Sequence, residues 1–206
     1  MLLAVVCNTA AATTFTAEIT DQDGRPVQNA VVSLVPDTKT AVPGASTRLP
    51  NDKVIDQRFE TFLPLVTIVP RNGRVVFANS DPTTHQVYSF SPAKQFEITL
   101  ARDSSSTPIA FPNAGVAALG CNIHDNMIAY IFVAESPWTG LTGADGRVVI
   151  EDVPPGNYQA QVWHHRYPPR RELPSAQIAV GTDTTRWAAT IRVLASSGTR
   201  SHKGSY

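Results

Sequence analysis

Apolar and polar residues alternate with a period of two along much of this chain, a pattern typical of half-buried β-strands. Residues 15–19 read FTAEI, with an apolar side chain at every second position. The same alternation recurs in HQVYSF, which begins at His85, and in QFEITL at 95–100. No long stretch spaces its apolar residues as a helix would. The pattern therefore predicts an all-β fold.

Turn signals divide these strands and suggest how they pair. Asn72-Gly73 predicts a hairpin between residues 66–70 and 74–78. The VPPGN turn predicts that residues 148–150 pair with 158–163. The 16 prolines and the many Val, Ile and Thr residues fit a β-protein that is rich in turns.

Length and charge narrow the function classes. The chain has 206 residues, of which 42% are hydrophobic, enough for one large domain or two small ones. The 17 basic and 17 acidic residues balance, so no charge excess attracts nucleic acid. No apolar run is long enough for a transmembrane segment.

The two ends of the chain lack the strand pattern. Residues 1–12 are apolar and then small, which resembles the end of a secretory signal peptide and predicts a periplasmic or secreted protein. Cys7 within this segment could instead accept a lipid. Removal of the segment would leave Cys121 as the only cysteine, a free thiol that metal ligation would protect. Residues 196–206 are expected to be a disordered tail.

Three soft or imidazole donors stand close together in LGCNIHDNMIAY, residues 119–130. Cys121, His124 and Met127 recur every three residues, so one short loop could turn them toward a common point. His85 would reach them from another strand. Two imidazoles, a thiolate and a thioether are the ligands of a mononuclear copper site for electron transfer. Zinc rarely takes a thioether, and iron–sulfur clusters need more cysteines.

Each donor also has an ordinary structural interpretation. A single buried Cys often acts as a small apolar residue, and a Met often fills a core. Two further histidines, His164 and His165, could form a secondary metal or partner site, although a hydrogen-bonded structural role is the simpler interpretation. His202 in the tail has no predicted role.

The segments VVFANSDPTTHQVYSF and LGCNIHDNM resemble the two ligand segments of plastocyanin-type cupredoxins. Residues 59–133, together with the later DGRVVIEDVPPGNY and WHHRY, resemble plastocyanin-like proteins of the methylamine-utilisation type. The resemblance implies a cupredoxin Greek-key β-sandwich with one type 1 copper. It also implies that His85, Cys121, His124 and Met127 are the copper ligands.

The chain departs from the plastocyanin pattern at two points. The spacing here is C-x2-H-x2-M, whereas in plastocyanins Met follows the second His after a longer gap. Gln86 follows the first His, where many cupredoxins have an Asn, so Gln86 or Asn79 would have to tie the ligand loops together. Asn122 and Asp125, between the ligands, could orient them by hydrogen bonds or could be solvated turn residues.

A second β-sandwich is expected around the first. The segment TAEITDQDGRPVQNAVVSLVP and the later DGRVVIEDVPPGNYQAQVWH resemble parts of carboxypeptidase regulatory-like (transthyretin-like) modules. This predicts an accessory sandwich in two parts, residues 14–49 and 136–195, with the copper domain of residues 50–135 inserted between them. Two sequential domains are the simpler alternative.

Together these features predict an exported blue-copper protein that carries single electrons to a transient redox partner as a monomer, and that is not an enzyme. A copper chaperone or storage protein would use the same residues. A structural or binding β-module would need none of them. A hydrolase with Cys121 as nucleophile and His124 as base lacks an evident third residue to orient the base. An oxidase would need a further His cluster.

Overall fold

The computed structural model describes residues 12–37, 49–124 and 126–195, and every regular element within these ranges is a β-strand. The predicted all-β class is therefore confirmed. The predicted signal segment with Cys7, the predicted tail with His202, and Asp125 lie outside the described residues, apart from Ala12. The described part contains no helix that is long and apolar enough to cross a membrane.

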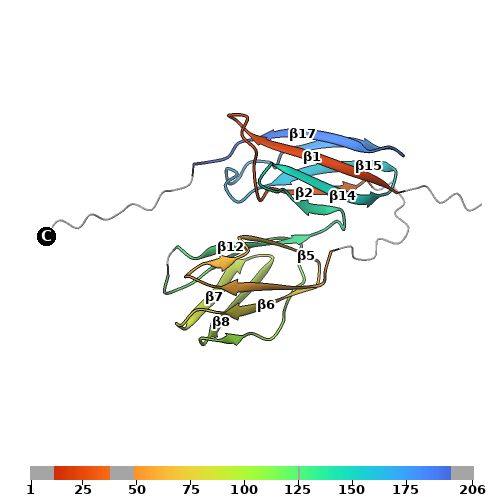
Figure 1. Ribbon diagram of the computed structural model, residues 1–206. Helices are drawn as coiled ribbons and strands as arrows, with labels where there is room; N and C mark the ends of the chain where they lie inside the picture. Colours follow the sequence, from red (N-terminus) through yellow and green to blue (C-terminus); the bar gives the residue numbers. More distant parts are fainter. Residues whose placement is uncertain (1–11, 38–48, 125, 196–206) are drawn as a thin grey trace, which may run out of the picture.

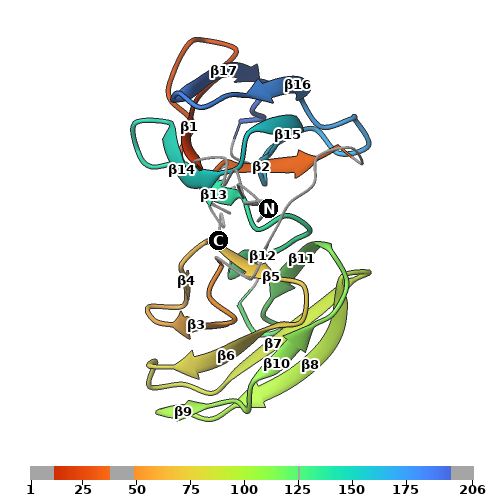
Figure 2. The same cartoon turned by 90° about the vertical axis from the view of Figure 1, so that its right-hand side faces the viewer.

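One sandwich is built from both ends of the chain (Figures 1 and 2). Its sheets have the strand orders β14-β1-β17 and β13-β2-β15-β16. The strands are β1 (Thr13–Asp21), β2 (Val31–Pro36), β13 (Thr139–Leu141), β14 (Arg147–Val153), β15 (Gly156–Trp163), β16 (Ser175–Val180) and β17 (Thr185–Ile191). Alternate residues point inward, and Phe15, Leu34, Trp138 and Tyr158 are buried in its core.

The other sandwich is continuous in sequence and is drawn below the first in Figure 2. One sheet has the order β10-β6-β3-β4, with β9 also paired to β6, and the other has the order β5-β12-β11-β7-β8. The strands are β3 (Asp52–Gln57), β4 (Phe62–Leu63), β5 (Val66–Pro70), β6 (Gly73–Asn79), β7 (His85–Ser91), β8 (Lys94–Leu100), β9 (Ser104–Ser105), β10 (Ile109–Phe111), β11 (Gly115–Gly120) and β12 (Ile128–Ala134). Phe62, Phe77, Phe111 and Ile131 are buried in its core.

The strand pairing predicted for both hairpins is wrong. β5 pairs with β12 and β6 pairs with β3, so the turn at Asn72-Gly73 joins strands of opposite sheets. Likewise β14 pairs with β1, whereas β15 pairs with β2 and β16. A turn signal specifies that the chain reverses, but the choice of sheet depends on which pairing buries the apolar face of each strand. Asn72 does have the left-handed φ of 63° that such a turn requires.

The two sandwiches meet through aromatic side chains. Tyr130 and Phe132 lie on the face of β12 that points away from its own core, and their rings are 5.6 and 5.7 Å from the ring of Trp163 on β15. His165, just beyond β15, lies 5.3 Å from the Tyr130 ring. The side chains of Tyr130 and Phe132 are therefore half-buried.

The second sandwich brings distant segments to one end. β7 begins at His85, β11 ends at Gly120, and β12 begins at Ile128. β7 and β12 both pair with β11, so the residues at these strand ends are neighbours. Cys121, which directly follows β11, therefore lies beside His85.

Candidate metal centre

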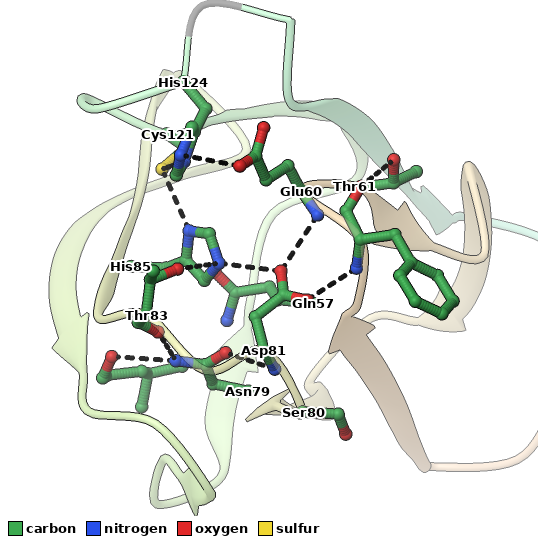
Figure 3. A network of polar contacts seen from close by, with 12 residues as sticks. Gln57, Glu60, Thr61, Asn79, Ser80, Asp81, Thr83, His85, Cys121 and His124 are labelled. Atoms are coloured by element: carbon green, nitrogen blue, oxygen red, sulfur yellow. Dashed lines mark hydrogen bonds and ion pairs between the residues drawn. The ribbon is translucent and has the colours of Figure 1, made fainter.

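Three of the four predicted ligands converge on one point. The Cys121 sulfur lies 3.7 Å from Nδ1 of His85 and 3.9 Å from Nδ1 of His124 (Figure 3). One donor atom from each of the three residues lies within 4.8 Å of the others. Within the described ranges this is the one group of three or more His, Cys, Asp or Glu residues with such spacing.

The arrangement fits a single transition-metal ion. Donor atoms that bind one ion at ~2.0–2.3 Å are separated by roughly 3.3–4 Å. The two sulfur–nitrogen distances of 3.7 and 3.9 Å agree with this separation. Cys121 is only 4% exposed and forms no disulfide. A thiolate with two imidazoles is a ligand set that suits copper.

His85 is fixed before any metal binds. Its side chain is fully buried, and its Nε2 lies 2.9 Å from the Asp81 carboxylate. Because an ionised carboxylate only accepts hydrogen bonds, Nε2 carries the proton and donates. In the neutral ring Nδ1 is then the atom with the lone pair, and it is the atom that faces Cys121.

His124 has a similar carboxylate partner. Its Nε2 lies 3.5 Å from Glu60, and its side chain is 23% exposed. The two imidazole rings stand 5.0 Å apart. His124 is thus the more accessible of the two rings, in agreement with its position on a loop at the end of the sandwich.

Met127, the fourth predicted ligand, lies in the same core cluster as Cys121. It is 1% exposed and lines the same groove as Cys121. Its backbone N–H donates to the carbonyl oxygen of His124 at 3.0 Å, which closes the short turn between them. The C-x2-H-x2-M spacing is therefore compatible with a compact loop that buries both sulfur-containing residues.

Hydrogen bonds tie the ligand segments together. The Asn122 amide donates to Gln86 at 2.9 Å and so links the Cys121 loop to the start of β7. The buried Asn79 amide donates to the carbonyl oxygens of Thr83, Leu100 and Ala101. Of the two residues expected to tie the ligand loops together, Gln86 therefore does so, whereas Asn79 holds the segment before His85.

Two carboxylates near the histidines were missed at the sequence level. Asp81 stands four residues before His85 in a turn-rich segment, so this spacing was an available signal. Glu60 has no comparable signal, because it comes from a different part of the chain. Burial raises the pKa of Asp81, but N–H donors from Glu60, His85 and Phe59 outweigh this and hold the pKa below its usual 3.8.

His164 and His165 lie far along the chain from this cluster and do not belong to it. His164 is 2% exposed, and its Nδ1 accepts a hydrogen bond from the Arg166 backbone N–H at 3.2 Å. Burial, with the positive charges of His165 and Arg166, lowers the pKa of His164 to about 4. His164 is therefore neutral at pH 7 and has a hydrogen-bonded structural role.

No protein-family model matches this chain, and no curated protein matches it. Solved structures do show a partial likeness. A purple cupredoxin from Nitrosopumilus maritimus is 20% identical over 40% of this chain and 100% of that one, with a TM-score of 0.36. A reduced Cu(I) form of amicyanin is 15% identical over 52% of this chain and 99% of that one, with a TM-score of 0.36.

A copper-containing nitrite reductase from Thermus scotoductus is also similar. It is 24% identical over 47% of this chain and 25% of that one, with a TM-score of 0.38. At these identities and TM-scores the likenesses do not assign the chain to a family. The proposal for its function therefore rests on the arrangement of its own side chains.

Proposed function

We propose that this chain is an exported, cupredoxin-type protein that binds one type 1 copper and carries single electrons. The observation that carries the proposal is the convergence of Nδ1 of His85, Nδ1 of His124 and the buried sulfur of Cys121. Met127 is proposed as the weak axial ligand, because it is buried beside Cys121. Residues 50–135 would form the copper domain, and residues 14–49 and 136–195 the accessory one.

The side chains favour electron transfer over chemistry on a substrate. A bound copper ion would supply a centre that gains and loses one electron. The protein's part is to hold its donors still, so that little rearrangement accompanies the change of charge. His85 is fully buried and hydrogen-bonded, and Cys121 lies between two imidazoles, so the donors are already in place.

A thiol hydrolase is the alternative function that this geometry resembles, because Asp81 orients His85 as a base beside the Cys121 thiol. Two features favour the metal site. The Cys121 side chain is 4% exposed, so a substrate carbonyl has little access to it. A nucleophilic thiol also needs one base, whereas two imidazoles here present the same nitrogen to one sulfur.

The surface beside the loop suits a transient partner. Ile123 and Ile128 are 56% and 47% exposed next to His124, as expected for an apolar docking rim. Leu119, by contrast, is buried in the core at 2% exposure and does not contribute to this surface. Phe90, which is 73% exposed, extends the apolar surface along the same sheet.

The test is the absorption spectrum of the protein loaded with Cu(II). A type 1 site gives an intense thiolate-to-copper band at roughly 600 nm. Cys121→Ser should abolish the band, and Met127→Ala should shift it. His164→Gln is the matched control, because that histidine lies outside the cluster and its loss should leave the colour unchanged.

Voltammetry then separates an electron carrier from a copper store. A carrier should show one fast, reversible one-electron wave, and a store should instead transfer Cu(I) to an acceptor without such a wave. A colourless Cu(II) complex with unaltered Cys121 reactivity toward iodoacetamide would defeat the proposal.

A further inference from the structure

Asp81 is the point at which three separate parts of the site meet (Figure 3). Its Oδ1 accepts the Phe59 backbone N–H at 2.6 Å, and its Oδ2 accepts the Glu60 backbone N–H at 2.9 Å. The same Oδ2 accepts from Nε2 of His85 at 2.9 Å. Asp81 itself is held by a hydrogen bond from its backbone N–H to the side chain of Asn79. The carboxylate is 5% exposed, so these donors are its main partners.

The turn that Asp81 binds has an unusual backbone. Phe59 and Glu60 follow one another with φ angles of 54° and 53°, a left-handed conformation that non-glycine residues rarely adopt. Backbone bonds between Arg58 and Thr61 close the turn at 3.0 and 3.2 Å. Strained backbone of this kind persists where the surroundings hold it, and Asp81 accepts both of the N–H groups that the turn points inward.

This turn places a second carboxylate at the second histidine. Glu60 reaches Nε2 of His124 at 3.5 Å from the side opposite to Cys121. The Phe59 ring, by contrast, points outward and is 79% exposed, so apolar burial does not hold the turn in place. The position of Glu60 therefore depends on the backbone bonds that close the turn and on the hydrogen bonds to Asp81.

We propose that Asp81 is a positioning residue for both histidines of the metal centre. It fixes His85 directly as the Nε2–H tautomer, which leaves the Nδ1 lone pair toward Cys121. It fixes His124 indirectly, by holding the turn that presents Glu60. The expected effect on copper binding rests on the proposed copper function. The His85 tautomer and the structure of the turn, in contrast, are properties of the metal-free protein.

The decisive variant is Asp81→Asn. An amide keeps only one acceptor oxygen: in the Oδ1 position it accepts from Phe59 and turns its NH₂ group toward Glu60 and His85, and in the Oδ2 position it accepts from Glu60 and His85 and turns its NH₂ group toward Phe59. Either His85 therefore changes to the Nδ1–H tautomer, in which a proton occupies the position of the lone pair, or the Phe59 N–H loses its acceptor. The backbone N–H group that loses its acceptor, that of Phe59 or that of Glu60, should exchange with solvent roughly tenfold faster.

Two measurements on the metal-free protein detect the change of the His85 tautomer and the loosening of the turn. Nitrogen-15 spectra of the imidazole rings at pH 8 identify the His85 tautomer, and amide hydrogen exchange reports the turn. Asp56→Asn is the matched control, because Asp56 is a neighbouring carboxylate that accepts from Ser80 and touches neither histidine. Copper binding should weaken about 10–100-fold in Asp81→Asn and stay unchanged in the control.

An unchanged His85 tautomer with unchanged exchange in Asp81→Asn would overturn the inference. If that variant does not fold, the wild-type protein decides the matter: an Nδ1–H tautomer, or fast exchange of both amides, refutes it. Failure of the wild-type protein to bind copper would instead refute the proposed function, and the tautomer and exchange data would still test the role of Asp81.

Discussion

Acid should destabilise the accessory sandwich through one buried histidine, His164. The ring is 2% exposed, it lies 4.2 Å from the ring of His165, and its Nδ1 accepts a backbone hydrogen bond. Protonation would place a charge in this site beside Arg166 and would turn the accepting nitrogen into a donor. Protonation of His164 is therefore less favourable in the folded protein than in the unfolded chain.

The size and sign of the effect follow from the two pKa values. Burial lowers the pKa of His164 to about 4 in the folded protein, against 6.5 when it is exposed. As the pH falls from 6.5 toward 4, the unfolded chain takes up a proton that the folded chain does not. Neutral His164 contributes fully to the free energy of unfolding above pH 6.5, and this contribution is lost as the pH falls from 6.5 to 4. The loss is about 1.4 kcal/mol for each pH unit, or about 3 kcal/mol in all.

Urea unfolding of the metal-free protein at several pH values between 7 and 4 measures this loss. All 3 tryptophans, Trp138, Trp163 and Trp187, lie in the accessory sandwich, so their fluorescence reports on its unfolding. His164→Gln keeps an acceptor and a donor but does not titrate. Its free energy of unfolding should therefore fall by about 3 kcal/mol less over the same range.

Equal pH dependence in the wild type and in His164→Gln would refute this reasoning. So would a midpoint near 6.5 for His164 itself in a proton NMR titration of the folded protein. His165→Gln serves as the control for the neighbouring ring, because burial also lowers the pKa of His165.

Three further substitutions test which interactions stabilise the two sandwiches. Asn79→Ala removes the amide that donates to three carbonyl oxygens near His85, so the free energy of unfolding should fall by about 1–3 kcal/mol, as followed by far-UV circular dichroism. Tyr158→Phe removes the hydroxyl that donates to the Pro154 carbonyl and should cost about 1 kcal/mol. Burial raises the pKa of Tyr158 to about 12, so the wild type should also lose stability as the pH rises from 10 to 12, and the variant should lose less. Gly146→Ala should cost about 1–3 kcal/mol, because φ is +74° and the added Cβ would lie 2.5 Å from a carbonyl oxygen; a melting temperature equal to that of the wild type would contradict this.

The ligand loop could be predicted because its three candidate ligands lie close together in the sequence. Cys121, His124 and Met127 lie within one short turn between two strands, so their spacing alone indicated that they could face one point. His85 was predictable for another reason: it stands at the start of an alternating strand, at the end of a sandwich where such residues gather. The all-β class followed in the same way from the alternation of apolar residues.

The strand pairing and the position of Glu60 could not be predicted in this way. Whether β5 joins β6 or β12 depends on which pairing buries both faces of the strands, and no turn signal contains that information. Glu60 reaches His124 from a distant segment, a contact that no local pattern in the sequence indicates.

The sequence by itself thus determined which residue types could bind a metal, since that depends on donor chemistry and on spacing along one loop. The tertiary structure alone decided which nitrogen of each imidazole faces the Cys121 sulfur. For His85 the partner that makes this choice is Asp81, four residues away, and for His124 the carboxylate partner is Glu60 from a distant segment; both contacts exist only once the two sheets have packed together.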